Sequence, residues 1–399
     1  MTEMHCRARR TFGGWLLVIF LVRTVVNTSF RIIYPFLPSI ARGLGISLAA
    51  AGGLVALRMV AGMSAPMLGP LVDRQPRRRV MVVGLLLFAL ASLLLGGIGT
   101  LTAAAIAFAL FGVAKVLYDL ATYAYVGDAV PYHTRGRAFG VVELSWSSAW
   151  LLGVPVSGFL VERLGWRAPW VVLVVLGLLG AWLTRVGLPF APRPTAHGGG
   201  GLLAGAIIAA WCNLLRRRSV VVLLLTSLLL SMAIETPFIV YGAWLEATFG
   251  LSLTALGLAS TVVGLAEATA EFGTTVVTDR LGKRRSVLAG LLGLTASMVV
   301  LPWLSRMGLA AALTGVALIM LTFEFSVVSL MPLVTELAPD ARASLLSLNV
   351  AAFSLARILG ALVGGWLWQW QNIALHAGVG AVCALGAMLL LAWGMKEIA

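Results

Sequence analysis

The chain has 399 residues, of which 60% are hydrophobic and 11% charged, and its net charge is +14. Soluble domains carry about 25% charged residues, so this composition excludes an ordinary soluble protein and indicates a chain that lies in a membrane. The basic residues stand in short clusters between apolar runs and form no aromatic-interleaved basic face, so nucleic acid is not an expected partner.

Twelve apolar runs follow one another along the chain, each near the roughly 20 residues that a helix needs to cross a bilayer. They predict a six-helix bundle over 1–188, a cytoplasmic linker over 189–218 that contains four consecutive glycines, and a second six-helix bundle over 219–399. The expected spans are 13–41, 47–68, 80–97, 101–126, 138–161, 168–188, 220–245, 251–277, 287–304, 309–333, 345–368 and 373–393.

The loops alternate in charge. With Arg185 at the inner end of span six included, 20 of the 29 Lys and Arg residues fall in the two tails, the linker and every second loop, and four fall in the loops of the opposite side. Cytoplasmic loops of membrane proteins carry the excess of Lys and Arg. We therefore expect a multi-pass protein of the inner membrane with both termini in the cytoplasm.

The two sets of spans also repeat one another. Three stretches recur in the same order at an offset of 205 to 208 residues, which indicates a duplicated six-span unit with a binding site between the two copies. The matches are Asp73–Arg79 with Asp279–Arg285, Asp128 with Glu336, and Leu152–Gly158 with Leu359–Gly365.

The segment that starts at Gly69 and contains Asp73 and Arg74 resembles the loop 2–3 signature of the major facilitator superfamily, with Pro76 where glycine is usual. The resemblance extends over essentially the whole chain. It implies an all-α integral membrane protein of two six-helix bundles related by pseudo-two-fold symmetry, which acts as a transporter. It also implies a cytoplasmic latch made by Gly69, Asp73, Arg74, Arg77, Arg78, Asp128, Asp279 and Arg280, whereas ordinary positively charged loops would also account for these residues.

Two further stretches bear on the direction of transport. Gly153–Gly158 resembles the antiporter-associated motif of the family, with Ser157 in place of a glycine, and Tyr34–Pro38 is similar to the outer end of span one in its drug-efflux branches. Both favour export by antiport. Small residues also permit close helix packing, which accounts for the first stretch equally well.

Eleven charged residues fall inside the predicted spans, besides Arg185 at the inner end of span six. A charge at the centre of a membrane helix costs about 2.5–3.5 kcal/mol, so these residues must face protein or water. They occupy spans 1, 2, 4, 5, 7, 8, 10 and 11, and in the family the remaining spans are peripheral. The cations are Arg23, Arg31, Arg58, Lys115 and Arg357, and the anions are Asp119, Glu143, Glu235, Glu267, Glu271 and Glu324.

Two interpretations of these charges stay open. In the first, Arg23, Arg31, Arg58 and Lys115 form an anion site; Asn27, which shares one face of span one with Arg23 and Arg31, together with Asp119 and Arg357 completes the expected cavity lining. In the second, the opposed signs are salt bridges between the halves. Proton coupling needs a carboxylate whose proton affinity changes with exposure. The candidates are Glu235 and Glu324, then Asp119 and Glu143, with Glu267 and Glu271 expected at a gate nearer the cytoplasm.

The sequence lacks the signatures of other classes of membrane protein. No phosphate-binding G-x-x-x-x-G-K-[ST] segment occurs, the four histidines are scattered, and the three cysteines have no metal-ligand spacing. We therefore expect neither an enzyme nor a metal or cofactor. The sequence predicts a monomeric secondary transporter for a small organic solute, with proton-coupled efflux favoured over organic-anion uptake or lipid or glycolipid flipping.

Overall fold

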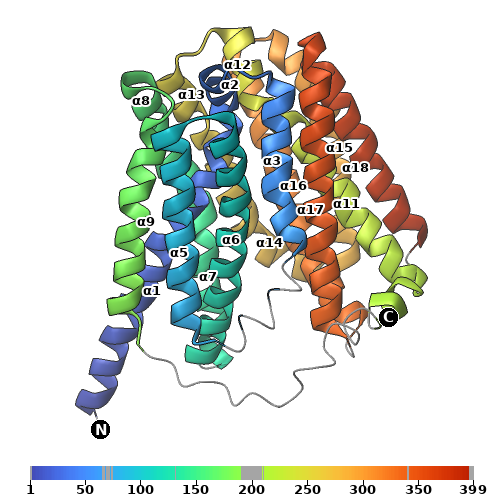
Figure 1. Ribbon diagram of the computed structural model, residues 1–399. Helices are drawn as coiled ribbons and strands as arrows, with labels where there is room; N and C mark the ends of the chain where they lie inside the picture. The colour runs from blue at the N-terminus through green and yellow to red at the C-terminus, as the bar shows by residue number, and fades with distance from the viewer. Residues whose placement is uncertain are drawn as a thin grey trace.

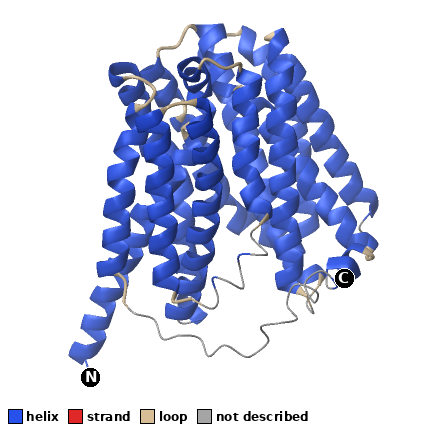
Figure 2. Ribbon diagram, in the orientation of Figure 1, coloured by secondary structure: helices blue, strands red, loops and turns tan. Residues whose placement is uncertain are grey.

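The computed structural model describes residues 2–64, 68, 72, 75–130, 132–189, 209, 211–338 and 341–394, and these residues form helices joined by short loops, with no strand among them (Figure 2). We call the part before the linker the N-half and the part after it the C-half. The N-half contains α1 (Thr2–Arg31), α2 (Ile33–Leu44), α3 (Leu48–Met63), α5 (Arg77–Leu93), the π-helical turn η1 (Leu94–Ile98), α6 (Leu101–Ala129), α7 (Tyr132–Ser148), the π-helical turn η2 (Ala149–Gly153), α8 (Val154–Leu164) and α9 (Ala168–Gly187). The C-half contains α11 (Arg218–Phe238), α12 (Tyr241–Phe249), α13 (Leu253–Ala259), α14 (Thr261–Leu281), α15 (Lys283–Arg306), α16 (Leu309–Leu337), α17 (Arg342–Leu367), the 3₁₀ turn η3 (Trp368–Trp370) and α18 (Ile373–Gly394).

Eleven helices among the described residues are long and apolar enough to cross a membrane. The pair Ile33–Leu44 and Leu48–Val60, bent by 116°, brings the number to as many as twelve. The all-α membrane fold predicted from the apolar runs is confirmed. The glycine run of the linker lies outside the described residues.

Span 1 and span 7 are each broken at the same point of the repeat. α1 gives way to α2 at Ile32, and α11 gives way to α12 at Ile239, an offset of 207 residues. Proline removes one backbone hydrogen bond and crowds the preceding turn, and Pro35 and Pro237 stand beside the two breaks. The two outer segments also end alike, because Gly45 and Gly250 adopt left-handed conformations that glycine reaches without strain.

The helices without intramembrane charges lie at the periphery. α5, α9, α15 and α18 make their main packing contacts within their own halves. α9 shows the consequence clearly: Val171, Val175, Trp182 and Val186 are exposed along one face, which suits contact with lipid. The predicted division into charged inner and apolar outer spans agrees with this arrangement.

The two halves contact each other through α2 with α12, α3 with α17, α8 with α13, and α7 and η2 with α14. Figure 1 places α2, α8, α12 and α13 at the end of the molecule opposite the two termini, which we call the far end. Glycines allow the closest approach there: a Cβ on Gly158 would stand 2.6 Å from the Leu253 carbonyl oxygen, and one on Gly257 would stand 3.1 Å from that of Val154. In this chain, the glycine-containing stretch at 153–158 packs one half against the other.

Candidate functional site

Arg23 is the centre of an ion-pair network inside the N-half. Its side chain is 1% exposed and lies 3.3 Å from both the Asp119 and the Glu143 carboxylates. It also donates to the Val142 carbonyl oxygen at 2.7 Å and to the Tyr123 hydroxyl at 2.5 Å. These acceptors come from α6 and α7, so Arg23 fastens α1 to both helices.

Lys115 belongs to the same network. Its ammonium lies 2.5 Å from the second Asp119 oxygen, one helical turn away, and 4.3 Å from the Trp146 ring centroid. Asn27 donates to Ser145 at 2.9 Å, and its own side-chain oxygen has no partner among the described residues. Two of the four cations expected in an anion site are therefore already neutralised by carboxylates of the same half.

Arg31 joins the two halves at mid-depth. Its guanidinium forms an ion pair with Glu267 of α14, and it stacks over the rings of Trp146 and Trp150 at 4.7 Å and 5.2 Å. Glu271, one turn further along α14, accepts a long hydrogen bond of 3.5 Å from Ser147 of α7. Both carboxylates expected at a gate thus lie against the N-half in the charged middle of the protein.

Glu324 of α16 adds a third carboxylate to this region. Glu267 and Glu271 act on it electrostatically, with Arg31 and Arg357 as the opposing cations. We call Glu267, Glu271 and Glu324 the acidic cluster. Among the described residues, Arg31 is the cation that forms an ion pair with this cluster, and one cation cannot neutralise three carboxylates.

A second group of charges surrounds Tyr34 of α2. The Tyr34 hydroxyl donates to the Glu235 carboxylate of α11, with distances of 3.2 Å and 3.1 Å to its two oxygens. Arg357 of α17 and Arg58 of α3 act on that carboxylate electrostatically. Arg58, Tyr34, Glu235 and Arg357 are called the basic cluster below.

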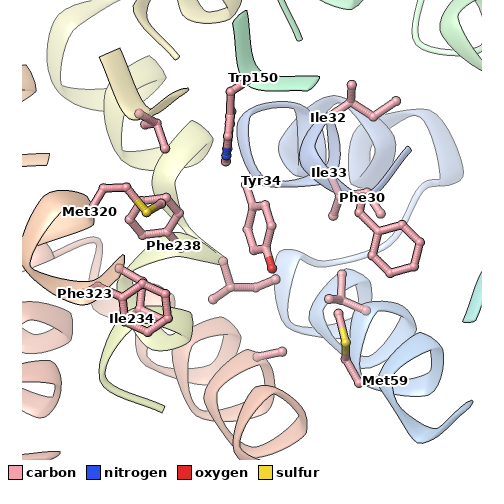
Figure 3. Close-up of a cluster of buried hydrophobic side chains, with 14 of the residues drawn as sticks. Phe30, Ile32, Ile33, Tyr34, Met59, Trp150, Ile234, Phe238, Met320 and Phe323 are labelled. Carbon is pink, nitrogen blue, oxygen red and sulfur yellow. The ribbon is translucent and has the colours of Figure 1, made fainter. Parts of the chain in front are cut away.

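Aromatic rings separate the two clusters. Figure 3 shows Tyr34 with Trp150 on one side and Phe238 on the other, and its hydroxyl at the end away from Trp150. The ring centroid of Tyr34 lies 6.3 Å from that of Trp150, in a stacked orientation, and 6.0 Å from that of Phe238, edge to face. Met320 and Phe323 of α16 continue the apolar wall beyond Phe238 (Figure 3). Tyr34, Trp150 and Phe238 are buried, so these rings form a packed apolar wall beside the hydrogen bond from Tyr34 to Glu235.

The far end is held closed by polar contacts between the halves. Arg42 and Glu246 form an ion pair at 2.9 Å beside a cavity of about 330 Å³. Glu162 at the end of α8 accepts a 2.6 Å hydrogen bond from the backbone N–H of Thr254, in the first turn of α13. The sequence analysis missed Glu162, because nothing near it in sequence indicates a helix terminus 92 residues away.

Ion pairs at the end that carries the termini lie within each half. Arg77 lies 3.5 Å from Asp128 and donates to the Val72 carbonyl oxygen, while Lys283 pairs with Glu336 at the corresponding place of the C-half. Arg78 donates to the carbonyl oxygen of Leu188 at the end of span 6. Of the remaining residues expected in a latch, Arg280 is exposed in the last turn of α14. Gly69, Asp73 and Arg74 lie outside the described residues, as does the side chain of Asp279.

Metal chemistry has no candidate site in the described part of the chain, where no three His, Cys, Asp or Glu residues stand close enough to hold an ion. His376 is buried between the carbonyl oxygens of Asn372 and Gly364, each 3.0 Å from one ring nitrogen. It packs span 12 against span 11.

Similar proteins agree with this architecture. An uncharacterised MFS-type transporter of Bacillus subtilis, YceJ, is 25% identical over 94% of both chains, and multidrug resistance protein 2 of the same organism is 23% identical over 92% of both. The purine ribonucleoside efflux pump NepI of Shigella sonnei is 26% identical over 90% of both chains. The D-xylose–proton symporter has the same fold, with a TM-score of 0.81, 18% identity and coverage of 97% of this chain and 98% of that one. The sequence profile of the Major Facilitator Superfamily matches residues 19–245 and 223–397, and the chain belongs to this family of membrane transporters.

Proposed function

We propose that this transporter exports a small organic solute in exchange for protons, through a site at mid-depth that opens alternately to each side of the membrane. The distribution of Lys and Arg supports a cytoplasmic position for both termini. In that orientation the far end faces the outside. The structure then corresponds to the state closed toward the outside.

The acidic cluster carries the proposal of proton coupling. Glu267 is 2% exposed and paired with Arg31, whereas Glu271 and Glu324 are half-buried and have no ion-pair partner among the described residues. An uncompensated carboxylate in a low-dielectric interior is costly, and binding a proton removes the charge. When the halves separate and water reaches the cluster, the charged form becomes acceptable again. Protons would therefore be taken up and released as the exposure of the cluster changes.

Two observations favour export. The relatives named for their activity include a multidrug resistance protein and a purine ribonucleoside efflux pump, each aligned over at least 90% of this chain. The aromatic and methionine wall around Phe238 also suits an apolar solute that enters from the membrane or the cytoplasm, because methionine and aromatic side chains adapt to ligands of varied shape. Movement of solute and protons in the same direction, as in the D-xylose–proton symporter, is the opposite outcome in the assay below.

The ion pairs at each end would set which side is open. Arg42 with Glu246 and the bond from Thr254 to Glu162 must break for outward opening. Arg77 with Asp128 would hold the cytoplasmic end of the N-half in shape and serve as the latch expected from the loop 2–3 signature. Salt bridges of this kind are weak individually, which suits contacts that form and break in every cycle.

The assay is solute-driven proton movement in proteoliposomes that contain a trapped pH-sensitive dye. We expect nucleosides or aromatic drugs loaded on the cytoplasmic side to drive protons in the opposite direction. Glu324→Gln should abolish the proton signal while leaving solute counterflow at equal concentrations intact, because exchange without net movement needs no proton. Proton movement in the same direction as the solute would refute antiport, and an unchanged proton signal in Glu324→Gln and Glu271→Gln would refute the role of the acidic cluster.

A further inference from the structure

Arg58 is a buried cation whose hydrogen-bonding groups are all unused. The residue is 1% exposed, and its three guanidinium nitrogens have no hydrogen-bond partner among the described residues. The Phe30 ring lies against it, with the ring centroid 4.0 Å from the guanidinium carbon. The ring covers one face of the guanidinium and leaves the edge, where the N–H groups point, without acceptors.

The other intramembrane cations of the N-half differ from Arg58. Arg23 lies beside two carboxylates, Lys115 lies beside one, and Arg31 pairs across the halves with Glu267. Arg58 and Arg357 are left on the packed helices α3 and α17, where each acts on the other electrostatically. Glu235 is the carboxylate of this cluster, and it is held by Tyr34.

The charges of the basic cluster do not balance. Arg357 also opposes Glu267 and Glu324, so the surplus in this cluster is the charge of Arg58. A buried guanidinium without acceptors is unfavourable by several kcal/mol. A carboxylate matches the planar fork of arginine with two parallel hydrogen bonds. Phe30, Tyr34 and Phe238 supply flat apolar surface beside the charge.

We infer that the solute is an aromatic or similarly flat organic monoanion, whose carboxylate binds the free edge of Arg58 while its body lies against the rings around Tyr34. This inference rests on the transport function proposed above and names its substrate class. The basic cluster holds the anion, and the acidic cluster across the aromatic wall carries the protons. The two bound species therefore occupy separate groups of residues.

The competing explanation is that Arg58 pairs with Glu235 when the halves move. The two explanations predict opposite effects of Glu235→Gln. If Glu235 is the natural partner, removing its charge leaves Arg58 without an acceptor in every state and destabilises the protein. If a solute carboxylate is the partner, Glu235→Gln removes a competing anion and strengthens binding.

The test is binding of benzoate, salicylate and 1-naphthoate to the detergent-purified full chain, measured by titration calorimetry and thermal unfolding, with 1-naphthamide as the uncharged analogue. We expect 1-naphthoate, but not the amide, to stabilise the wild type and the exposed-charge control Arg306→Gln. Arg58→Gln should weaken binding about tenfold to a hundredfold, as expected for one charge-assisted pair. Arg58→Lys, which keeps the charge but loses the fork, should weaken it less, and Glu235→Gln should bind at least as tightly as wild type.

Any of three results would overturn the inference: no carboxylate binds to the wild type, the acid and the amide bind equally, or binding is unchanged in both Arg58 variants. A fourth result would also overturn it: Glu235→Gln is less stable than wild type, and adding Arg58→Gln lowers the stability no further. That result identifies the two side chains as partners. The proteoliposome assay separates this failure from failure of the transport proposal. Nucleosides or cations that drive protons equally in wild type and Arg58→Gln would leave proton-coupled export standing and refute the anion site alone.

Discussion

Gly242 of α12 lies against the backbone of α2 in the other half, and a single methyl group there should open the far end. A Cβ at this position would lie 1.9 Å from the carbonyl oxygen of Pro35 and 2.5 Å from its carbonyl carbon. Carbon and oxygen atoms in contact are usually about 3.3 Å apart, so the helices α2 and α12 would have to separate by about 1.4 Å. Both obstructing atoms are backbone, so no side-chain rotation relieves the clash.

Overpacking of this kind costs about 1–3 kcal/mol, and every 1.4 kcal/mol changes a two-state equilibrium tenfold. Opening the far end removes the clash, so Gly242→Ala should lower the ratio of closed to open molecules at the far end about tenfold, the factor for a cost of about 1.4 kcal/mol. Alanine is also the better helix former by about 1 kcal/mol, which raises the stability of α12 in both states and has to be controlled when thermal stability is compared. Gly53→Ala is the matched control, because a Cβ on Gly53 meets no atom within 4 Å.

The assay is the rate of maleimide labelling at Ala41→Cys, a buried position of α2 that lines the far-end cavity, in a chain whose native cysteines are serine. The rate should rise about tenfold or more in Gly242→Ala and stay near the parent value in Gly53→Ala. Equal labelling rates in the two variants, with normal thermal stability, would refute the reasoning that backbone contact between α2 and α12 keeps the far end closed.

Three further predictions concern single charges. Arg23→Gln removes the buried cation shared by Asp119 and Glu143, while Lys115 still pairs with Asp119, so it should lower the free energy of unfolding by about 1.5–3 kcal/mol, seen as a fall in the thermal unfolding midpoint; a change no larger than that of Arg306→Gln would contradict the network. Exchange of the charges at Arg77 and Asp128 should restore part of the transport rate that either single reversal removes, and a double variant no better than the singles would argue against their pairing. Glu162→Ala should increase labelling at the far end by less than Gly242→Ala does, because its bond to α13 is exposed to water, and a larger effect would show that this bond dominates the closure.

The architecture could be predicted from the sequence because the membrane constrains it so strongly. Spans of sufficient length, the clustering of Arg and Lys in alternate loops, and the repeat at about 207 residues each limit the topology independently of side-chain packing. The breaks near Pro35 and Pro237 also have a sequence signal, although the predicted spans 13–41 and 220–245 were drawn as continuous.

The site could be predicted only as a set of residues. Periodicity placed Lys115 and Asp119 on one helix face, and the structure pairs them. It could not show that Arg23 meets Glu143, since that depends on how α1 and α7 are rotated about their axes. Of the four cations expected in an anion site, the structure pairs Arg23, Arg31 and Lys115 with carboxylates and leaves Arg58 without a hydrogen-bond partner among the described residues.

The separation between the halves, measured at both ends of one molecule, tests alternating access most directly. Two spin-label pairs serve this purpose: Ile46→Cys with Leu251→Cys at the far end, and Ala129→Cys with Ser344→Cys at the end of the termini. On acidification or addition of a transported solute, the account predicts that one distance distribution lengthens while the other shortens. Distances that stay fixed, or that lengthen at both ends together, would contradict a rocking motion of two halves about a central site.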